Sequence, residues 1–180
     1  MKPRYFIFRI IMLLLIGFFV ACEEKDTGIE PDRKVVFEVN YANSAWFKQF
    51  RGFVIDKNGM VRKYDNPADW NAVKEGSGIS ASQMEQNLSQ TSESHYTVPV
   101  QLLEQYISLA DNISSNYTKP VRRGADHGII SYYAYLYNDK KQTYTPILLG
   151  QTGDIEIFNT DKNAVEILEW LSGIYEHAYN

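Results

Sequence analysis

The stretch IISYYAYLYNDKKQTYTPILL, residues 129–149, decides the fold class of this chain. Residues 129–137 and 142–149 each alternate between aliphatic and aromatic or polar side chains. Alternation at a period of two is typical of β-strands, whose successive side chains point to opposite faces of a sheet. Because a short polar tip, Asp139-Lys140, separates the two runs, the stretch predicts an antiparallel hairpin.

The register of this hairpin determines which side chains lie together. Pairing Asn138 with Lys141 places the aliphatic residues on one face and three tyrosines, Tyr133, Tyr135 and Tyr144, on the other. An open tyrosine face would offer a large, rigid contact area to a glycan or a protein partner. The alternative is that a helix covers the face, which would make the three rings structural.

Further strands are expected on both sides of this hairpin. Residues 34–41 alternate in the same way, and residues 154–158 follow Gly153 as a last strand. Residues 51–56 and 60–64 flank Lys57-Asn58-Gly59, and an Asn-Gly pair favours the positive φ of a tight reversal. These segments predict a second antiparallel hairpin.

Three segments carry helical signals. Ser80 and Gln83 match a capping box, with Ile79 and Met84 at the positions of a hydrophobic staple. Residues 99–113 have apolar side chains at helical spacing, and the final helix begins after Thr160 or Asp161. The predicted fold is α+β: a mainly antiparallel sheet of about five to six strands, including the two hairpins, packed with about three helices.

The N-terminus has the three zones of an export signal. Basic residues precede an apolar run at residues 10–20 that is too short for a comfortable membrane span, and small residues then lead to Cys22. Residues 1–21 resemble the signal of bacterial lipoproteins. This resemblance implies cleavage before Cys22 and lipid on its thiol, and the alternative is an ordinary secretory signal or an uncleaved anchor. Residues 22–33 are expected to form a flexible tether and residues 34–180 a single domain.

Charge narrows the classes of partner. The chain has 18 basic and 22 acidic residues, and residues 1–21 contain three of the basic ones and none of the acidic ones. The mature chain therefore has 15 basic against 22 acidic residues, a net charge of −7. Because nucleic-acid binders need clusters of basic residues that neutralise phosphates, nucleic acid is not an expected partner.

One loop concentrates chemically useful side chains. Arg122, Arg123, Asp126 and His127 lie within seven residues of 122–128, where arginines can hold an anion and Asp126 can orient His127. The alternative is a charged surface loop. Cys22 is taken by lipid and the three histidines are far apart in the sequence, so neither a catalytic residue, nor a metal site, nor a cofactor is predicted.

The domain is similar to small lipoproteins of Bacteroidota in its signal through Cys22, in residues 53–59, and in residues 148–154 leading to 168–171. The acidic residues that follow Cys22 resemble the export signal of surface lipoproteins in that phylum, and the alternative is a generic charged linker. The expectation is a lipid-anchored, non-enzymatic binding or interaction domain of the cell envelope, in the outer membrane and exposed at the surface, that binds a protein or a glycan. Two alternatives stay open: a small hydrolase that uses the Asp126-His127 loop, and an immunity or inhibitor lipoprotein.

Overall fold

A computed structural model describes residues 32–45, 47–73 and 77–179 of the chain. The predicted signal at 1–21, the lipidation site Cys22 and all of the predicted tether except Asp32 and Arg33 lie outside these residues. Arg33 is buried, and its guanidinium donates to the backbone carbonyl of Tyr135. In the part of the chain that the structure describes, no helix is both long and apolar enough to span a bilayer.

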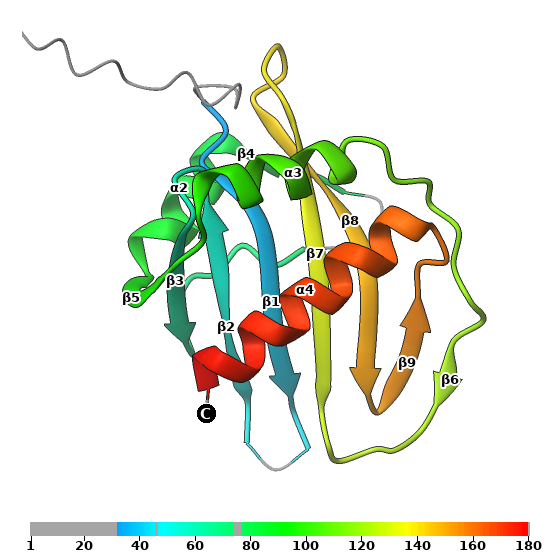
Figure 1. Ribbon diagram of the computed structural model, residues 1–180. Helices are drawn as coiled ribbons and strands as arrows, with labels where there is room; N and C mark the ends of the chain where they lie inside the picture. Colours follow the sequence, from blue (N-terminus) through cyan, green and yellow to red (C-terminus); the bar gives the residue numbers. More distant parts are fainter. Residues whose placement is uncertain (1–31, 46, 74–76, 180) are drawn as a thin grey trace, which may run out of the picture.

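The described residues form one antiparallel sheet of nine strands, so the predicted α+β class is confirmed (Figure 1). Eight strands follow one another across the sheet. The ninth, β4, is not in this order and pairs with the first residues of β8. In order across the sheet they are β5 (Ser92–Thr97), β3 (Met60–Asp65), β2 (Gln49–Asp56), β1 (Val35–Asn43), β7 (Ile129–Asn138), β8 (Thr143–Gly153), β9 (Ile155–Phe158) and β6 (Val121–Arg122), with β4 (Ile79–Ser80) off this path.

The prediction of five to six strands is too low because β4, β5 and β6 give no readable signal. Two of them have two residues each, and β5 is a polar edge strand that pairs with β3 through an irregular register. The start of the predicted Arg122–His127 loop overlaps β6. Such strands form through pairing with a neighbour rather than through a hydrophobic pattern of their own.

The described residues also form three helices: α2 (Ala81–Ser89), α3 (Val100–Ala110) and α4 (Lys162–Tyr179). The predicted capping box of α2 is confirmed, because the Ser80 hydroxyl accepts from the backbone N–H of Gln83 and the Gln83 side chain accepts from that of Ser80. Asp161 precedes α4, and its carboxylate accepts from the backbone N–H of Asn163 at 2.8 Å. The middle helix ends at Ala110, three residues before its predicted end.

The helices cover opposite faces of the sheet. In Figure 1, α3 and α4 cross the near face, whereas α2 lies behind the sheet. The near face carries the larger core, which includes Phe37, Leu103 and Ile167. The far face carries a smaller core that includes Met84 of α2, Tyr135 of β7 and Tyr144 of β8. Both faces are therefore buried, although the far face is covered by much less helix.

The β7–β8 hairpin pairs Asn138 with Thr143, so the predicted pairing of Asn138 with Lys141 is wrong. The tip has four residues, 139–142, instead of two. The Asn138 side chain accepts from the backbone N–H of Lys141, and Gln142 adopts a positive φ of 51°. These two features close a longer turn than the sequence suggests.

Candidate functional site

Two of the three predicted binding tyrosines are buried. The side chains of Tyr135 and Tyr144 are 0 % exposed and pack with Ile79 and Met84, while Tyr133 is half-buried. The expectation of an open tyrosine face is wrong for Tyr135 and Tyr144, because α2 covers that face.

These two tyrosines fasten the start of the domain to the sheet. The Tyr144 hydroxyl accepts from the backbone N–H of Lys34 at 2.7 Å and donates to the carbonyl of Asp32 at 3.3 Å. The backbone carbonyl of Tyr135 holds Arg33. Their roles are therefore structural, and they act at the end of the sheet where β1 begins (Figure 1).

A row of polar and small residues crosses the far face of the sheet. Register places it on five neighbouring strands, from β3 through β2, β1 and β7 to β8: Tyr64, Gly52, Asn40, Ser131 and Gln151. Asn40 and Ser131 are buried, and Gln151 donates to the hydroxyl of Ser131 at 3.0 Å. The centre of this face is therefore polar although little of it is open to solvent.

Glu38 lies beside this row and is only 2 % exposed. Its carboxyl accepts from the hydroxyl of Tyr64 at 2.6 Å, from the hydroxyl of Tyr135, and from the Asn40 side chain at 3.2 Å. Burial raises the pKa of Glu38, and the three hydrogen bonds oppose this effect without cancelling it. Burial also raises the pKa of Tyr135, which keeps that phenol protonated as a donor.

The hydrogen bond to Glu38 fixes an aromatic stack above β2. Gly52 leaves room for it, because a Cβ there would lie 2.6 Å from the Tyr64 hydroxyl and 2.2 Å from the backbone carbonyl of Val39. The ring of Trp70 lies on the ring of Tyr64, with centroids 4.0 Å apart, and Phe50 lies 6.1 Å from Trp70. Glycine at position 52 of the strand therefore allows the Tyr64 ring to approach the backbone closely.

The outer ring of this stack, Trp70, lines a groove between residues 42–44 and 48–50 on one side and residues 66–72 on the other. The groove has a volume of about 480 Å³, which lies in the range of about 300–1,000 Å³ for small-molecule sites. Phe50, a proline and three alanines supply apolar surface. The polar lining comes from Ser44, Lys48, Gln49 and Asn66. An aromatic ring surrounded by hydroxyl, amide and ammonium groups can bind a ligand that is apolar on one face and polar at its edges.

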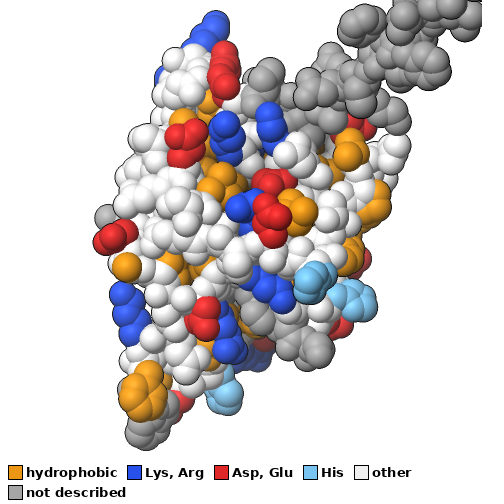
Figure 2. Space-filling model, turned by 90° about the vertical axis from the view of Figure 1, so that its left-hand side faces the viewer, with side chains coloured by type: hydrophobic (Ala, Val, Ile, Leu, Met, Phe, Trp, Pro, Cys, Tyr) orange, Lys and Arg blue, Asp and Glu red, His pale blue; other side chains and the backbone are white. Residues whose placement is uncertain are grey.

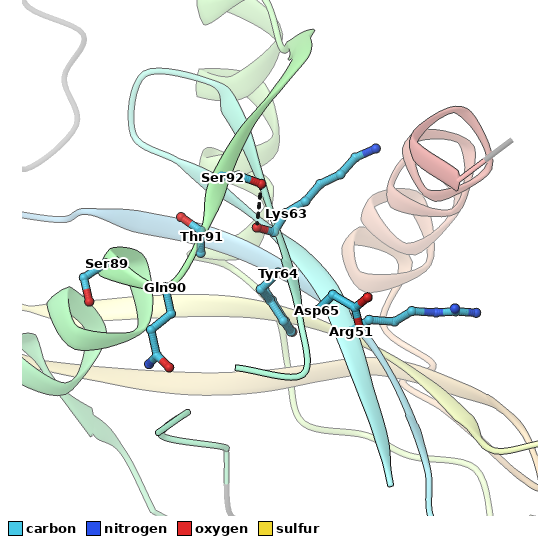
Figure 3. Close-up of a pocket in the computed structure, with 8 residues that line it drawn as sticks. All are labelled: Arg51, Lys63, Tyr64, Asp65, Ser89, Gln90, Thr91 and Ser92. Carbon is cyan, nitrogen blue, oxygen red and sulfur yellow. Dashed lines mark hydrogen bonds between the residues drawn. The ribbon is translucent and has the colours of Figure 1, made fainter. Parts of the chain in front are cut away.

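A second hollow lies on the other side of the stack and is lined by Tyr64 (Figure 3). The long side chains of Arg51 and Lys63 run away from it toward the C-terminal end of α4, and Lys63 donates to the carbonyl of Ala178. Arg51 lies 5.0 Å from the centroid of the Tyr41 ring. Because the charged ends of Arg51 and Lys63 point away from this hollow, we favour the groove as the candidate ligand site.

The edge of the sheet at β5 carries charges of both signs, which Figure 2 shows side by side. Arg62 lies 2.8 Å from the carboxylate of Glu93 and 3.9 Å from that of Asp56. Charges that pair locally give no field of one sign over this edge, and we place no site there.

Asp154 organises the Arg122–His127 loop. Its carboxylate accepts from the backbone N–H groups of His127 and Gly128 at 3.1 and 3.0 Å, and it lies 3.6 Å from Nδ1 of His127. The expectation that Asp126 orients His127 is therefore wrong. The backbone carbonyl of Asp126 accepts from Asn43, and the His127 side chain is 84 % exposed.

The two arginines of the loop bind within the protein. Arg123 forms an ion pair with Glu156 at 2.7 Å, and Arg122 donates to the carbonyl of Gly124 at 3.1 Å. These contacts match a charged surface loop held against β9, the alternative noted from the sequence.

Among residues 32–45, 47–73 and 77–179, no cluster of histidine, cysteine and carboxylate side chains has the arrangement of a metal site. No family model, curated protein or solved structure matches the chain. No relative therefore suggests a ligand for the groove.

Sequence reasoning did not identify Glu38, Trp70 or the groove. Glu38 falls at a polar position of an alternating strand and resembles a solvent-facing residue there. One signal was present: Gly52 lies inside a strand, where glycine often marks a close approach.

Proposed function

We propose that this chain is a lipid-anchored, non-enzymatic binding domain of the bacterial cell envelope whose ligand occupies the Trp70 groove. The observation that carries the proposal is the aromatic stack. Trp70 is held at the groove by Tyr64, and Tyr64 is held by the buried Glu38. Such a prearranged ring loses little conformational freedom when a ligand binds.

The position of the groove supports this function. The domain begins at the end of the sheet where β1 starts, and the β1–β2 connection lies at the opposite end (Figure 1). The eight-residue strand β2 separates the two ends by roughly 25 Å. A domain tethered through residues 22–33 would present the groove away from the membrane. The acidic residues after Cys22 favour the outer membrane and the cell surface.

The hydrolase alternative lacks a comparable arrangement. His127 is exposed and its carboxylate neighbour, Asp154, is occupied by backbone N–H groups. General acid–base chemistry needs a side chain within hydrogen-bond reach of a bound substrate, and neither of the two hollows described above includes the loop. We therefore propose no catalytic residue.

Lipidation at Cys22 is testable by metabolic labelling. The precursor expressed in a Gram-negative host with labelled palmitate should incorporate label, and Cys22→Ser should abolish incorporation, because the chain has no other cysteine. In-gel fluorescence or autoradiography measures this. Equal label in the two forms would contradict the proposed anchor.

Presentation of the groove is testable by energy transfer to the bilayer. With Cys22 lipidated, Ala68→Cys at the groove and Asn58→Cys at the β2–β3 turn each provide a single free, exposed thiol. After labelling and reconstitution into vesicles with a headgroup acceptor, the donor at residue 68 should transfer less energy than the donor at residue 58. Greater transfer from residue 68 would place the groove against the membrane and contradict the proposed orientation.

A further inference from the structure

Building on the proposed function, we propose that the ligand is a saccharide, with one pyranose ring lying on Trp70 and its hydroxyls bound by the polar side chains of the groove. A pyranose ring has a face of C–H groups and an equator of hydroxyls. The negative face of an aromatic ring attracts such weakly positive hydrogens. The groove offers a matching surface for each: the Trp70 ring for the C–H face and polar side chains for the hydroxyls.

The flat surface comes from Trp70. Tyr64 occupies one side of the indole ring and lines the other hollow, whereas Trp70 lines the groove. Trp70 is half-buried, so part of its surface remains open. The indole also packs near Phe50, with ring centroids 6.1 Å apart. A ligand with a flat apolar face suits this surface.

The polar side chains suit hydroxyls. In the described part of the chain, Ser44, Lys48 and Gln49 are exposed and their side chains make no hydrogen bond or ion pair. Asn66 is held in place because its carbonyl oxygen accepts from the backbone N–H of Phe50 at 2.8 Å. Its amide donates to Asp65 and has one N–H left. Together these groups offer both donors and acceptors, as neighbouring sugar hydroxyls require.

Charge and backbone pairing argue against two other ligand classes. Among the described residues that line the groove, Lys48 is the one with an ionisable side chain, so a cationic ligand is disfavoured. An extended peptide usually adds a strand to a free sheet edge. Beside the groove, β1 pairs with β2 as far as Asn43 and Gln49, and the backbone N–H and carbonyl of Phe50 both bond to Asn66. Recognition there must rely on side chains.

The test uses the full-length lipidated protein in detergent, applied to immobilised bacterial, plant and host polysaccharides. A phage-displayed peptide library forms a parallel arm. At least one polysaccharide should bind the native protein, and Trp70→Ala should weaken that binding by at least about tenfold, as truncation of a central aromatic contact does. Trp70→Phe keeps a ring and should lose less. Tyr117→Ala is the matched control, since Tyr117 is an exposed aromatic residue at the opposite edge of the sheet.

Trp70→Ala removes a packed ring, so circular dichroism must establish that it folds. Gln49→Ala provides a second variant at an exposed position, and it should weaken binding by about threefold, the loss of one hydrogen bond. Polysaccharide binding that is equal in native protein, Trp70→Ala and Gln49→Ala overturns the site. Trp70-dependent binding of peptides without any polysaccharide overturns the saccharide and leaves the proposed binding function intact. If neither arm gives a Trp70-dependent ligand, both proposals are wrong.

Discussion

Replacing Tyr135 with alanine should lower the free energy of unfolding by about 3–5 kcal/mol, the usual cost of deleting a large buried aromatic side chain. The ring is fully buried and meets Tyr144 edge to face at 6.1 Å. Its hydroxyl also donates to Glu38. Equilibrium urea unfolding followed by circular dichroism measures the loss.

Two variants separate the contributions to this loss. Tyr135→Phe keeps the ring and removes one hydrogen bond to the buried carboxyl, so it should cost about 1–3 kcal/mol. Tyr96→Ala, at a tyrosine that is 40 % exposed on the edge strand β5, should stay within about 0.5 kcal/mol of the native chain. If Tyr135→Ala and Tyr96→Ala cost the same small amount, Tyr135 is not part of the core.

The burial of Tyr135 shows how far a hairpin can be predicted from its residues. The predicted register differs from the observed one by two residues over most of the hairpin, which leaves every side chain there on its predicted face. The grouping of Tyr133, Tyr135 and Tyr144 on one face is therefore correct. Their exposure was not predictable, because α2 reaches that face through the pairing of β4 with β8, a contact between distant segments.

Local signals predicted most of the other elements. The capping box at Ser80 and the Asn58-Gly59 turn depend on neighbouring residues, and both are confirmed, with Gly59 at a φ of 82°. The groove forms where residues 42–44 and 48–50 lie against residues 66–72. Residues 66–72 have no periodic pattern, so the sequence gives no indication that Trp70 lies on Tyr64. A groove formed by two such separate segments can be identified only from the folded structure.

Glu38 joins the sheet to the aromatic stack, and replacing it with leucine should cost on the order of 3 kcal/mol or more. The reason is the loss of a shared acceptor: the buried hydroxyls of Tyr64 and Tyr135 and the side chain of Asn40 all donate to this carboxyl. A buried donor left without a partner costs about 1–3 kcal/mol, and the apolar surface that leucine adds offsets part of the sum. Urea unfolding at pH 7 measures the change, and a cost below about 1 kcal/mol would contradict the role assigned to Glu38.

The pH dependence of stability isolates the charge of Glu38 from its hydrogen bonds. Burial raises the pKa of this carboxyl above its ordinary value of 4.5, so above pH 4.5 the folded chain retains a proton that the unfolded chain releases. The contribution of Glu38 to the free energy of unfolding is therefore fully present below pH 4.5 and is lost as the pH rises through the raised pKa. Burial also raises the pKa of Asp56, which adds a slope of the same sign to every variant that keeps it. Glu38→Gln keeps an acceptor for the tyrosines and cannot ionise, so it should show the shallower slope and should cost less than Glu38→Leu. Equal slopes in the native chain and Glu38→Gln between pH 4.5 and 8 would mean that Glu38 titrates like a solvated glutamate.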